Sequence, residues 1–267
     1  TLALGMDLYK DWIVDILNEL LKPEMIYERN DASVRTIEGL PLQKGFLKGD
    51  GDTVLTVREN GLLFQADIEN GQKTGFFYDQ RENRRLLANF VSGAEVLDCF
   101  CFTGSFAVHA AAYGAKQVTG VDISAAAIDI AARNAALNQV SDRCEFIEAN
   151  AFDLLREYSD EGRLYDTVIL DPPAFTKSRS SVESAARGYK EINLRGLKMI
   201  RPGGFLVTCS CSFHMNRDLF HSIVAEAAAD ARRTVREVAY LSQAKDHPSL
   251  PTAPETNYLK FLVLEVQ

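Results

Sequence analysis

The chain has 267 residues, 46% of them hydrophobic, and a formal net charge of −8 at pH 7. This length and composition suffice for a large buried core and favour one large domain with a smaller one. The acidic balance disfavours a broad nonspecific nucleic-acid surface, because phosphate binding needs clustered Lys and Arg, although a local basic site is compatible with it. Without an eighteen-residue apolar run or a signal-peptide pattern, the sequence predicts a soluble, cytoplasmic protein that does not contact a membrane.

The five cysteines and four histidines do not follow the spacing of metal ligands. Two C-x-C pairs occur, Cys99 with Cys101 and Cys209 with Cys211, and both lack the C-x-x-C spacing of common zinc sites. An odd number of cysteines without a secreted framework favours reduced thiols. The sequence therefore predicts no metal, and leaves Cys209 and Cys211 open between packing in a core and chemistry at a site.

The first part of the chain predicts a small α+β domain over residues 1–78. Residues 6–22 follow the pattern of an amphipathic helix that ends at Pro23. Residues 53–57 and 62–66 read as strands on either side of Asn60-Gly61, and these two residues favour a hairpin because they tolerate positive φ.

The second part, residues 79–267, predicts an α/β domain. Apolar strand-like runs alternate with helical patterns at residues 95–99, 117–121, 144–148, 167–170 and 204–208. This alternation is typical of a parallel sheet with crossover helices. Residues 234–241 and 258–266 read as two further strands with little room for a helix between them, so they should be antiparallel. The expected fold is Rossmann-like, with a seven-stranded, mostly parallel sheet.

Ligands of such sheets bind outside the carboxyl ends of the strands. The turn after residues 95–99 has one glycine, Gly104, and lacks the G-x-G-x-x-G pattern, which disfavours a dinucleotide and favours a smaller nucleoside. Asp122 ends the second strand and is placed to accept hydrogen bonds from ribose hydroxyls, or simply to cap a loop. Asn150 follows the third strand, where its amide could read an adenine edge. Asp171 follows the fourth, and the two prolines after it form a rigid lip.

The Asp-Pro-Pro segment resembles the class I S-adenosylmethionine methyltransferases, in which this motif carries the group that faces a base or amine. More closely, five segments together are similar to the bacterial 23S ribosomal RNA cytosine-5 methyltransferases: KTGFFYDQR at 73–81, LDCFCFTGSF at 97–106, LDPPAF at 170–175, RGYKEIN at 187–193 and SCS at 210–212. The resemblance extends from about Met6 to the end. That family usually begins with a small RNA-binding PUA domain, for which there is no room before Thr1, so the chain is expected to be a fragment or a shortened branch.

The resemblance implies S-adenosylmethionine as cofactor, large-subunit ribosomal RNA as partner and methyl transfer to C5 of a cytosine. The small domain should then face the substrate RNA, and self-association to a homodimer is left open. The catalytic residues implied are Cys211 and Asp171. The implied cofactor-binding residues are Gln80, Arg81, Asp98, Phe100, Gly104, Asp122, Ile123, Asn150, Ala151 and Asp171. The implied substrate-binding residues are Pro172, Pro173, Phe175, Lys177, Tyr189, Lys190 and Asn193.

The chemistry explains why a cysteine is needed. C5 of cytosine is too weak a nucleophile to take a methyl group directly, so a thiolate adds first at C6. Cys211 matches the SCS motif, whereas Cys209 has no matching role and is expected in the core. Ala174 stands where many other RNA cytosine methyltransferases have a second cysteine. Asp171 is expected to hydrogen-bond the polar edge of the cytosine and favour proton uptake at N3, or to orient the cofactor's amine.

Two other functions remain open. A guanine N-methyltransferase would use Asp-Pro-Pro and need no thiol, and a noncatalytic ribosome-assembly factor would bind S-adenosylmethionine without turnover. Basic residues stand out in the acidic chain and predict salt-dependent RNA binding unless they are solvated helix faces. They are Arg81, Arg84, Arg85, Lys177, Arg179, Arg187, Lys190 and Arg195.

Overall fold

The computed structural model describes residues 1–176 and 178–267 and separates into two compact units. The smaller unit comprises Thr1–Val57 with Gln65–Phe77, and the larger comprises Arg58–Phe64 with Tyr78–Gln267. Both boundaries near residues 57 and 65 fall inside the hairpin of β3 (Val54–Glu59) and β4 (Leu62–Asp67). The chain therefore enters the larger unit, leaves it, and enters it again.

The smaller unit holds helices α1 (Leu4–Leu8), α2 (Lys10–Leu21) and α3 (Val34–Ile37) and the antiparallel strands β1 (Ile26–Asn30) and β2 (Gln43–Lys48). The helix expected over residues 6–22 is thus divided in two at Tyr9. Lys22 adopts a left-handed conformation, with φ of 47°, directly before Pro23, and this ends α2 where the sequence indicated. Arg35 of α3 is buried and pairs with Asp7 of α1 at 3.0 Å.

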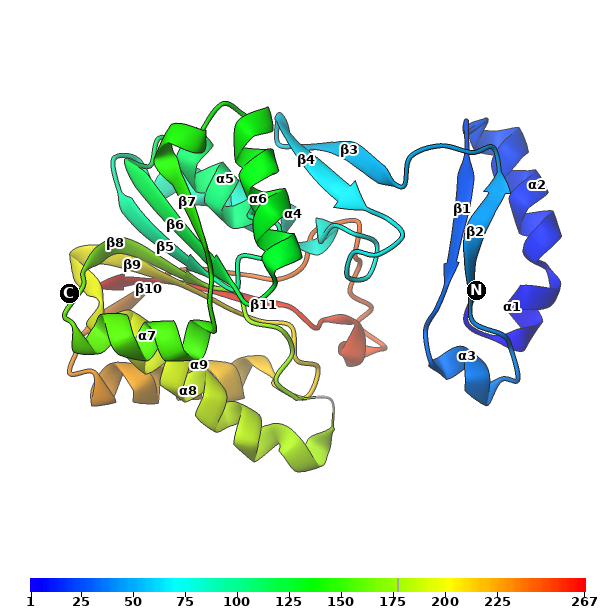
Figure 1. Ribbon diagram of the computed structural model, residues 1–267. Coiled ribbons are helices and arrows are strands. Elements are labelled where there is room, and N and C mark those ends of the chain that lie inside the picture. Colours follow the sequence, from blue (N-terminus) through cyan, green and yellow to red (C-terminus); the bar gives the residue numbers. More distant parts are fainter. Residues whose placement is uncertain (177) are drawn as a thin grey trace. The chain divides into compact units, whose positions relative to one another are not determined.

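The larger unit is built on a seven-stranded sheet with the order β10-β11-β9-β8-β5-β6-β7 (Figure 1). Its strands are β5 (Glu95–Cys99), β6 (Gln117–Asp122), β7 (Cys144–Glu148), β8 (Tyr165–Leu170), β9 (Ile200–Ser210), β10 (Val235–Leu241) and β11 (Lys260–Val266). Strands β5 to β9 are mutually parallel, whereas β11 is antiparallel to both β9 and β10. The predicted mostly parallel seven-stranded sheet is confirmed.

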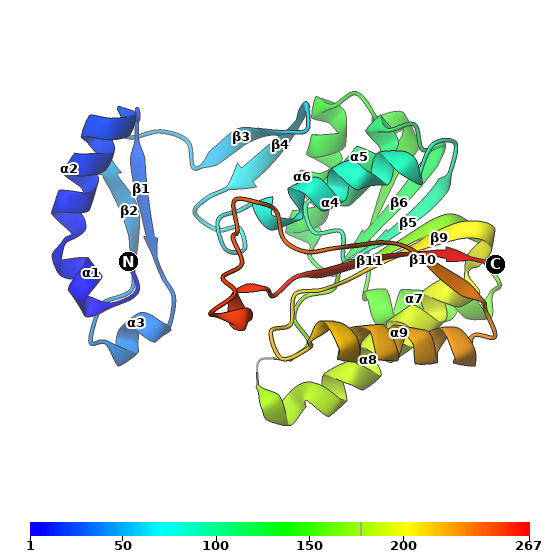
Figure 2. The same ribbon diagram turned by 180° about the vertical axis from the view of Figure 1, so that it is seen from behind.

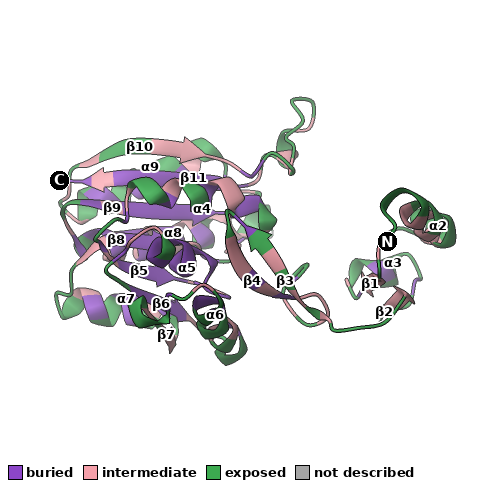
Figure 3. Ribbon diagram, turned by 90° about the horizontal axis from the view of Figure 1, so that it is seen from above, coloured by how far each residue is buried: buried purple, intermediate pink, exposed green. Residues whose placement is uncertain are grey.

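Helices cover both faces of this sheet, as the two opposite views show (Figures 1 and 2). On one face lie α4 (Arg81–Leu86), α5 (Ser105–Ala112) and α6 (Ala125–Leu137), and on the other α7 (Ala151–Asp160), α8 (Val182–Lys198) and α9 (Arg217–Asp230). The central strands are buried along most of their length (Figure 3). Their apolar side chains form one core with those of α7, α8 and α9, which explains why the strands read as continuous hydrophobic runs. None of the helices that the structure describes is both long and apolar enough to span a bilayer.

The tip of the β3–β4 hairpin belongs to the larger unit and is fixed there by a buried ion pair. Asn60 and Gly61 have φ of 50° and 88°, which confirms the hairpin expected at these residues. Arg84 of α4 donates two hydrogen bonds to Glu59, at 2.6 and 2.9 Å, and both side chains are about 1% exposed. The expectation that Arg84 contributes to an RNA-facing surface is therefore wrong, because its charge is neutralised in the interior. His109 lies beside this pair, and burial lowers its pKa to about 3.

Candidate active site

Five parallel strands end at one edge of the sheet, and the residues after them form the candidate site. The turn after β5 is tightly constrained, because Phe100, Phe102 and Gly104 all have positive φ, of 64°, 49° and 74°. Such conformations are costly for residues other than glycine and concentrate at functional sites. Two backbone N–H groups tie the turn to β6: that of Cys101 donates to the Val121 carbonyl, and that of Phe102 donates to the side-chain Oδ2 of Asp122, both at 2.9 Å.

Gly104 is required by packing as well as by its φ. A Cβ atom there would lie 2.8 Å from that of Ala131 on α6 and 3.0 Å from the ring of Phe146 on β7. Gly120, in the middle of β6, would meet the same ring at 2.6 Å. Only a residue without a side chain allows helix and strands to approach this closely.

Asp98, near the end of β5, is a fully buried carboxyl group, and neither of its oxygens has a geometrically sound hydrogen bond. Burial raises its pKa well above the usual value, the neighbouring Asp171 adds to the rise, and the backbone N–H of Ala107 acts in the opposite direction. The enclosed site favours the neutral acid, and because Asp98 has no exposed surface, its carboxyl group cannot contact a ligand in this conformation.

The next two strand ends present the residues expected to bind a nucleoside. The Asp122 carboxylate accepts hydrogen bonds from the backbone N–H groups of Phe102 and Ser124, at 2.9 and 3.0 Å. Its remaining lone pairs are available for ribose hydroxyls. Ile123 is 71% exposed beside it. Asn150 caps α7 by accepting from Phe152 N–H at 2.9 Å, and its NH₂ group stays available to read a base, while Ala151 is buried as the first residue of that helix.

Aromatic rings from three strand ends gather at this edge. Phe100 lies 6.0 Å from Phe152 and 6.4 Å from Phe175, measured between ring centroids, and Phe152 and Phe175 are 5.5 Å apart. All three side chains are partly exposed. The structure thus brings together Phe100, assigned by resemblance to the cofactor, and Phe175, assigned to the substrate.

Asp171 directly follows β8 and lies in a polar network. Gln80 Nε2 donates to Asp171 Oδ1 at 3.1 Å, and Asn83 Nδ2 in turn donates to Gln80 Oε1 at 2.6 Å, which fixes the orientation of the Gln80 amide. The Cys209 thiol lies next to this carboxylate. Surrounding protein and then the negative charge of Asp79 raise the pKa of Asp171 to about 7, although the residue keeps part of its surface exposed. An acid of this pKa can donate or accept a proton near neutral pH.

The two prolines after Asp171 differ in exposure, since Pro172 is buried and Pro173 is exposed. Pro173 is therefore the one that can contact a ligand. Lys177, expected to bind substrate, lies outside the described residues.

The two thiols of β9 have different environments. Cys209 is fully buried, as expected, and burial followed by the charge of Asp171 raises its pKa well above the ordinary value. Cys211 lies just beyond the last residue of β9, Ser210, and is partly exposed. The Tyr189 hydroxyl holds both neighbours of Cys211. It accepts a hydrogen bond from Ser210 Oγ at 3.0 Å and shares another with Ser212 Oγ at 2.9 Å. The Ser-Cys-Ser segment is therefore clamped on both sides of the thiol.

Several residues expected to contact the substrate have other roles in the structure. Tyr189 and Asn193 have no exposed surface, so neither can contact a substrate in this conformation. Asn193 hydrogen-bonds the Tyr189 carbonyl at 2.8 Å and supports α8. Lys190 pairs with Glu226 and Asp230 of α9, at 3.2 and 3.0 Å, which leaves little of its charge for a phosphate.

The other basic residues divide into paired and unpaired groups. Arg187 and Arg195 of α8 form ion pairs, and Arg81 pairs with Asp246 at 2.8 Å and with Glu82 at 3.1 Å while remaining one-third exposed. Within residues 1–176 and 178–267, Arg85 and Arg179 are exposed and form no ion pair within 4.0 Å. These two are the better candidates for phosphate contact.

The sequence reasoning missed Lys260 and Tyr258, which lie next to the Ser-Cys-Ser segment. Lys260 begins β11 and is 4% exposed, and its Nζ donates to the carbonyl oxygens of Ser212 and Tyr258, both at 2.7 Å. The Tyr258 hydroxyl donates to Asp79 Oδ2 at 2.7 Å. The only feature of the sequence that could have indicated these two site residues was the presence of a lysine within the apolar run of residues 258–266.

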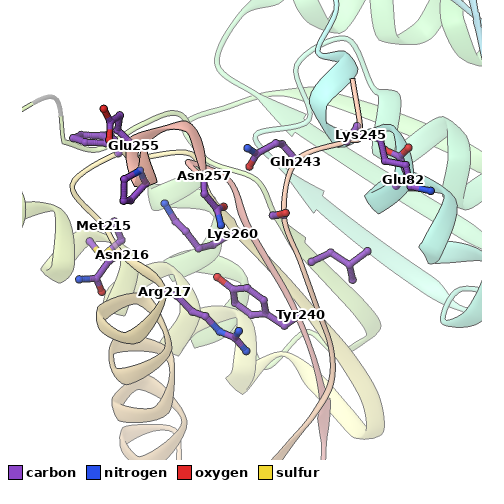
Figure 4. Close-up of a pocket in the computed structure, with 15 residues that line it drawn as sticks. Glu82, Met215, Asn216, Arg217, Tyr240, Gln243, Lys245, Glu255, Asn257 and Lys260 are labelled. Atoms are coloured by element: carbon purple, nitrogen blue, oxygen red, sulfur yellow. The ribbon is translucent and has the colours of Figure 1, made fainter. Parts of the chain in front are cut away.

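A cavity of about 770 Å³ opens beside Lys260 (Figure 4). Phe213 and Met215, which follow the Ser-Cys-Ser segment, line it, as do Arg217 and Tyr240 from α9 and β10. The guanidinium of Arg217 lies over the Tyr240 ring at 4.0 Å from its centroid. None of the five cysteines forms a disulfide, and the described residues contain no group of three or more His, Cys, Asp and Glu side chains that could hold a metal ion.

Comparisons with known proteins place this geometry in context. The family model of the S-adenosylmethionine-dependent methyltransferases matches residues 41–264. Proteins named ribosomal RNA large subunit methyltransferase I from Alteromonas mediterranea and Shewanella amazonensis are each 45% identical to the chain. Each match covers 99% of this chain and 67% of the relative's length. A solved structure of a protein described as a methyltransferase, complexed with SAH, has a TM-score of 0.82 at 22% identity, over 96% of this chain and 65% of that one. That likeness supports the fold alone.

Proposed function

Because the chain belongs to the S-adenosylmethionine-dependent methyltransferases, we propose that it methylates C5 of a cytosine in large-subunit ribosomal RNA through a covalent bond to Cys211. The relatives named for ribosomal RNA methylation support the substrate class. The observation that carries the cytosine-5 assignment is the position of Cys211. This thiol is partly exposed, its neighbours are held by Tyr189, and it lies two positions beyond Cys209, which is next to Asp171.

The residues at the strand ends fit the cofactor. When bound, S-adenosylmethionine supplies an electrophilic methyl group. Asp122 would accept hydrogen bonds from the ribose hydroxyls. The rings of Phe100 and Phe152 supply apolar surface for a base. Arg81 would have to leave Asp246 to reach a cofactor carboxylate or an RNA phosphate.

The chain's own residues would carry out the rest of the reaction. The Cys211 thiolate would form an S–C bond to C6 of the cytosine, and the electrons of the C5–C6 double bond would be displaced into the ring. Asp171, protonated below its pKa of about 7, would give its proton to N3 as this charge develops. After the methyl group has reached C5, loss of the C5 proton to a base and departure of Cys211 would restore the aromatic ring, while Asp171 takes back the N3 proton.

Two substitutions and one trapping reagent test this proposal. Cys211→Ala should abolish methylation of ribosomal RNA from a strain lacking the enzyme while leaving SAH binding unchanged. Cys144→Ala, which alters another partly exposed thiol at the start of β7, is the matched control and should retain activity. RNA with 5-fluorocytosine at the target should form an adduct with Cys211, because fluorine cannot leave as a proton does.

The results also distinguish the rival functions. Full methylation by Cys211→Ala, with the product identified by mass spectrometry as N-methylguanine, would assign the Asp-Pro-Pro segment to guanine N-methylation instead. Binding of SAH without methylation of either naked RNA or precursor particles would favour a noncatalytic assembly factor.

A further inference from the structure

Lys260 is a buried cation attached to the segment that carries Cys211. Its ammonium group donates to the carbonyl oxygen of Ser212, the residue after Cys211, at 2.7 Å. In the sheet, Lys260 lies opposite Ser210, the residue before Cys211, through the antiparallel pairing of β11 with β9. The lysine therefore flanks the thiol from a strand far from it in sequence.

The charge of this lysine is compensated by no carboxylate among the residues that the structure describes. Its two recorded acceptors are neutral carbonyls, those of Ser212 and Tyr258. Burial lowers the pKa of Lys260 to about 8, and a negative charge on Cys211 acts in the opposite direction. A buried ammonium is costly without an opposite charge, and a Cys211 thiolate would supply one. The attraction is mutual, since a nearby cation lowers the pKa of a thiol.

Three other titratable groups that act on or lie beside Cys211 are neutral near pH 7. Tyr189 of α8, Tyr258 before β11 and Cys209 of β9 all have raised pKa values, with burial as the first cause in each case. Of these neighbours, only Lys260 can provide positive charge. Lys260 also lines the cavity of Figure 4, so that a proton on its Nζ can exchange with solvent.

We propose that Lys260 is a positioning residue that keeps Cys211 ready for attack. It fixes the backbone of the Ser-Cys-Ser segment through the Ser212 carbonyl, and its positive charge stabilises the Cys211 thiolate. The S–H bond of Cys211 breaks, its proton passes to solvent because the thiol is partly exposed, and no electrons are gained or lost. The role of this pair in methyl transfer rests on the proposed function, whereas the ion pair itself does not.

The pH dependence of alkylation tests the ion pair directly. The chain is treated with iodoacetamide at a series of pH values, and modification of each cysteine is followed by peptide mass spectrometry. Lys260→Met, which keeps the length and removes the charge, should raise the midpoint of the Cys211 profile by at least about one pH unit and slow its alkylation at pH 7 by about tenfold. Lys260→Arg keeps the charge and should preserve the low midpoint, whereas Cys144 should react alike in all variants.

Circular dichroism and SAH binding confirm that each variant is folded. A folded Lys260→Met with an unchanged Cys211 profile would overturn the proposal. If that variant does not fold, the chain without substitutions tests the proposal instead. The pH midpoint of its Cys211 alkylation must lie below about 8.5, the pKa of a free thiol, and a higher midpoint would overturn the proposal. A lysine-dependent profile together with full methylation by Cys211→Ala would uphold the ion pair and refute the proposed function, so the two failures are distinguishable.

Discussion

Substitution of Asp171 by Asn should stabilise the fold more at pH 8 than at pH 5. The pKa of Asp171 is raised from 3.8 to about 7 in the folded chain. An acid whose pKa is higher in the folded than in the unfolded state destabilises the fold progressively as pH rises from about 4 to about 7, because the unfolded state loses its proton first. Asp171→Asn removes this penalty at every pH. Any other effect of the substitution on stability should be nearly independent of pH.

The magnitude follows from the two pKa values. Since one pKa unit corresponds to slightly more than 1 kcal/mol, the penalty is about 2 kcal/mol at pH 5 and about 4 kcal/mol at pH 8. The free energy of unfolding gained by Asp171→Asn should therefore be larger at pH 8 by about 2–3 kcal/mol. Taking the difference between two pH values cancels constant contributions, such as an altered hydrogen bond from Gln80.

Urea unfolding of wild type and variant at both pH values provides the measurement. It should be followed by circular dichroism, because the single tryptophan, Trp12, belongs to the smaller unit and would report on the wrong part of the chain. Asp129→Asn, at an exposed position on α6, is the matched control and should give a difference near zero. An equal gain for Asp171→Asn at pH 5 and pH 8 would refute the raised pKa and, with it, the proton donation to N3.

Four further predictions follow from the described contacts. Glu59→Gln should lower the free energy of unfolding by about 3–5 kcal/mol, because it leaves the Arg84 charge buried and unpaired; denaturant unfolding measures this, and a loss below about 1 kcal/mol would contradict it. Cys209→Ala should cost about 1–3 kcal/mol of stability by the same measurement and retain methylation in the folded fraction, so loss of activity without loss of stability would argue against a packing role. Asp122→Ala should weaken SAH binding in calorimetry by about 1–3 kcal/mol, and unchanged affinity would remove Asp122 from the cofactor site. Arg179→Glu should weaken binding to ribosomal RNA and reduce the salt dependence of that affinity by about one charge, whereas an unaltered salt slope would make Arg179 part of an ordinary solvated surface.

The sequence predicted those parts of the fold that depend on local pattern. Each of the seven strands was indicated by a short apolar run, because strands covered by helices on both faces need apolar side chains on both sides. The hairpin was indicated by Asn60 and Gly61, whose positive φ is a property of the residues themselves. Burial of Cys209 was also expected, although that expectation depended on a family motif rather than on pattern.

The burial and ion pairing of individual charged residues could not be predicted from local pattern. Arg81, Arg84 and Arg85 lie within two turns of α4, yet only Arg84 is buried, because its partner Glu59 comes from a hairpin 25 residues earlier. The environment of Lys260 likewise depends on Ser212, 48 residues away. Composition and periodicity describe a residue and its near neighbours, whereas these pKa values and ion pairs depend on which distant segment the fold brings alongside.

Two separate segments of the chain form the larger unit, and this limits how the two units can be expressed separately. Residues 58–64 belong to that unit although both their flanks belong to the other, so the gene segment beginning at residue 78 does not encode the whole larger unit. An expression clone that starts there would omit Glu59 and leave the interior site of Arg84 without its counter-charge. A clone for the methyltransferase unit should instead retain the hairpin tip, or supply residues 58–64 as a separate peptide. For the same reason, exchanging the smaller unit between relatives requires two crossover points on the hairpin in addition to the junction near residue 77.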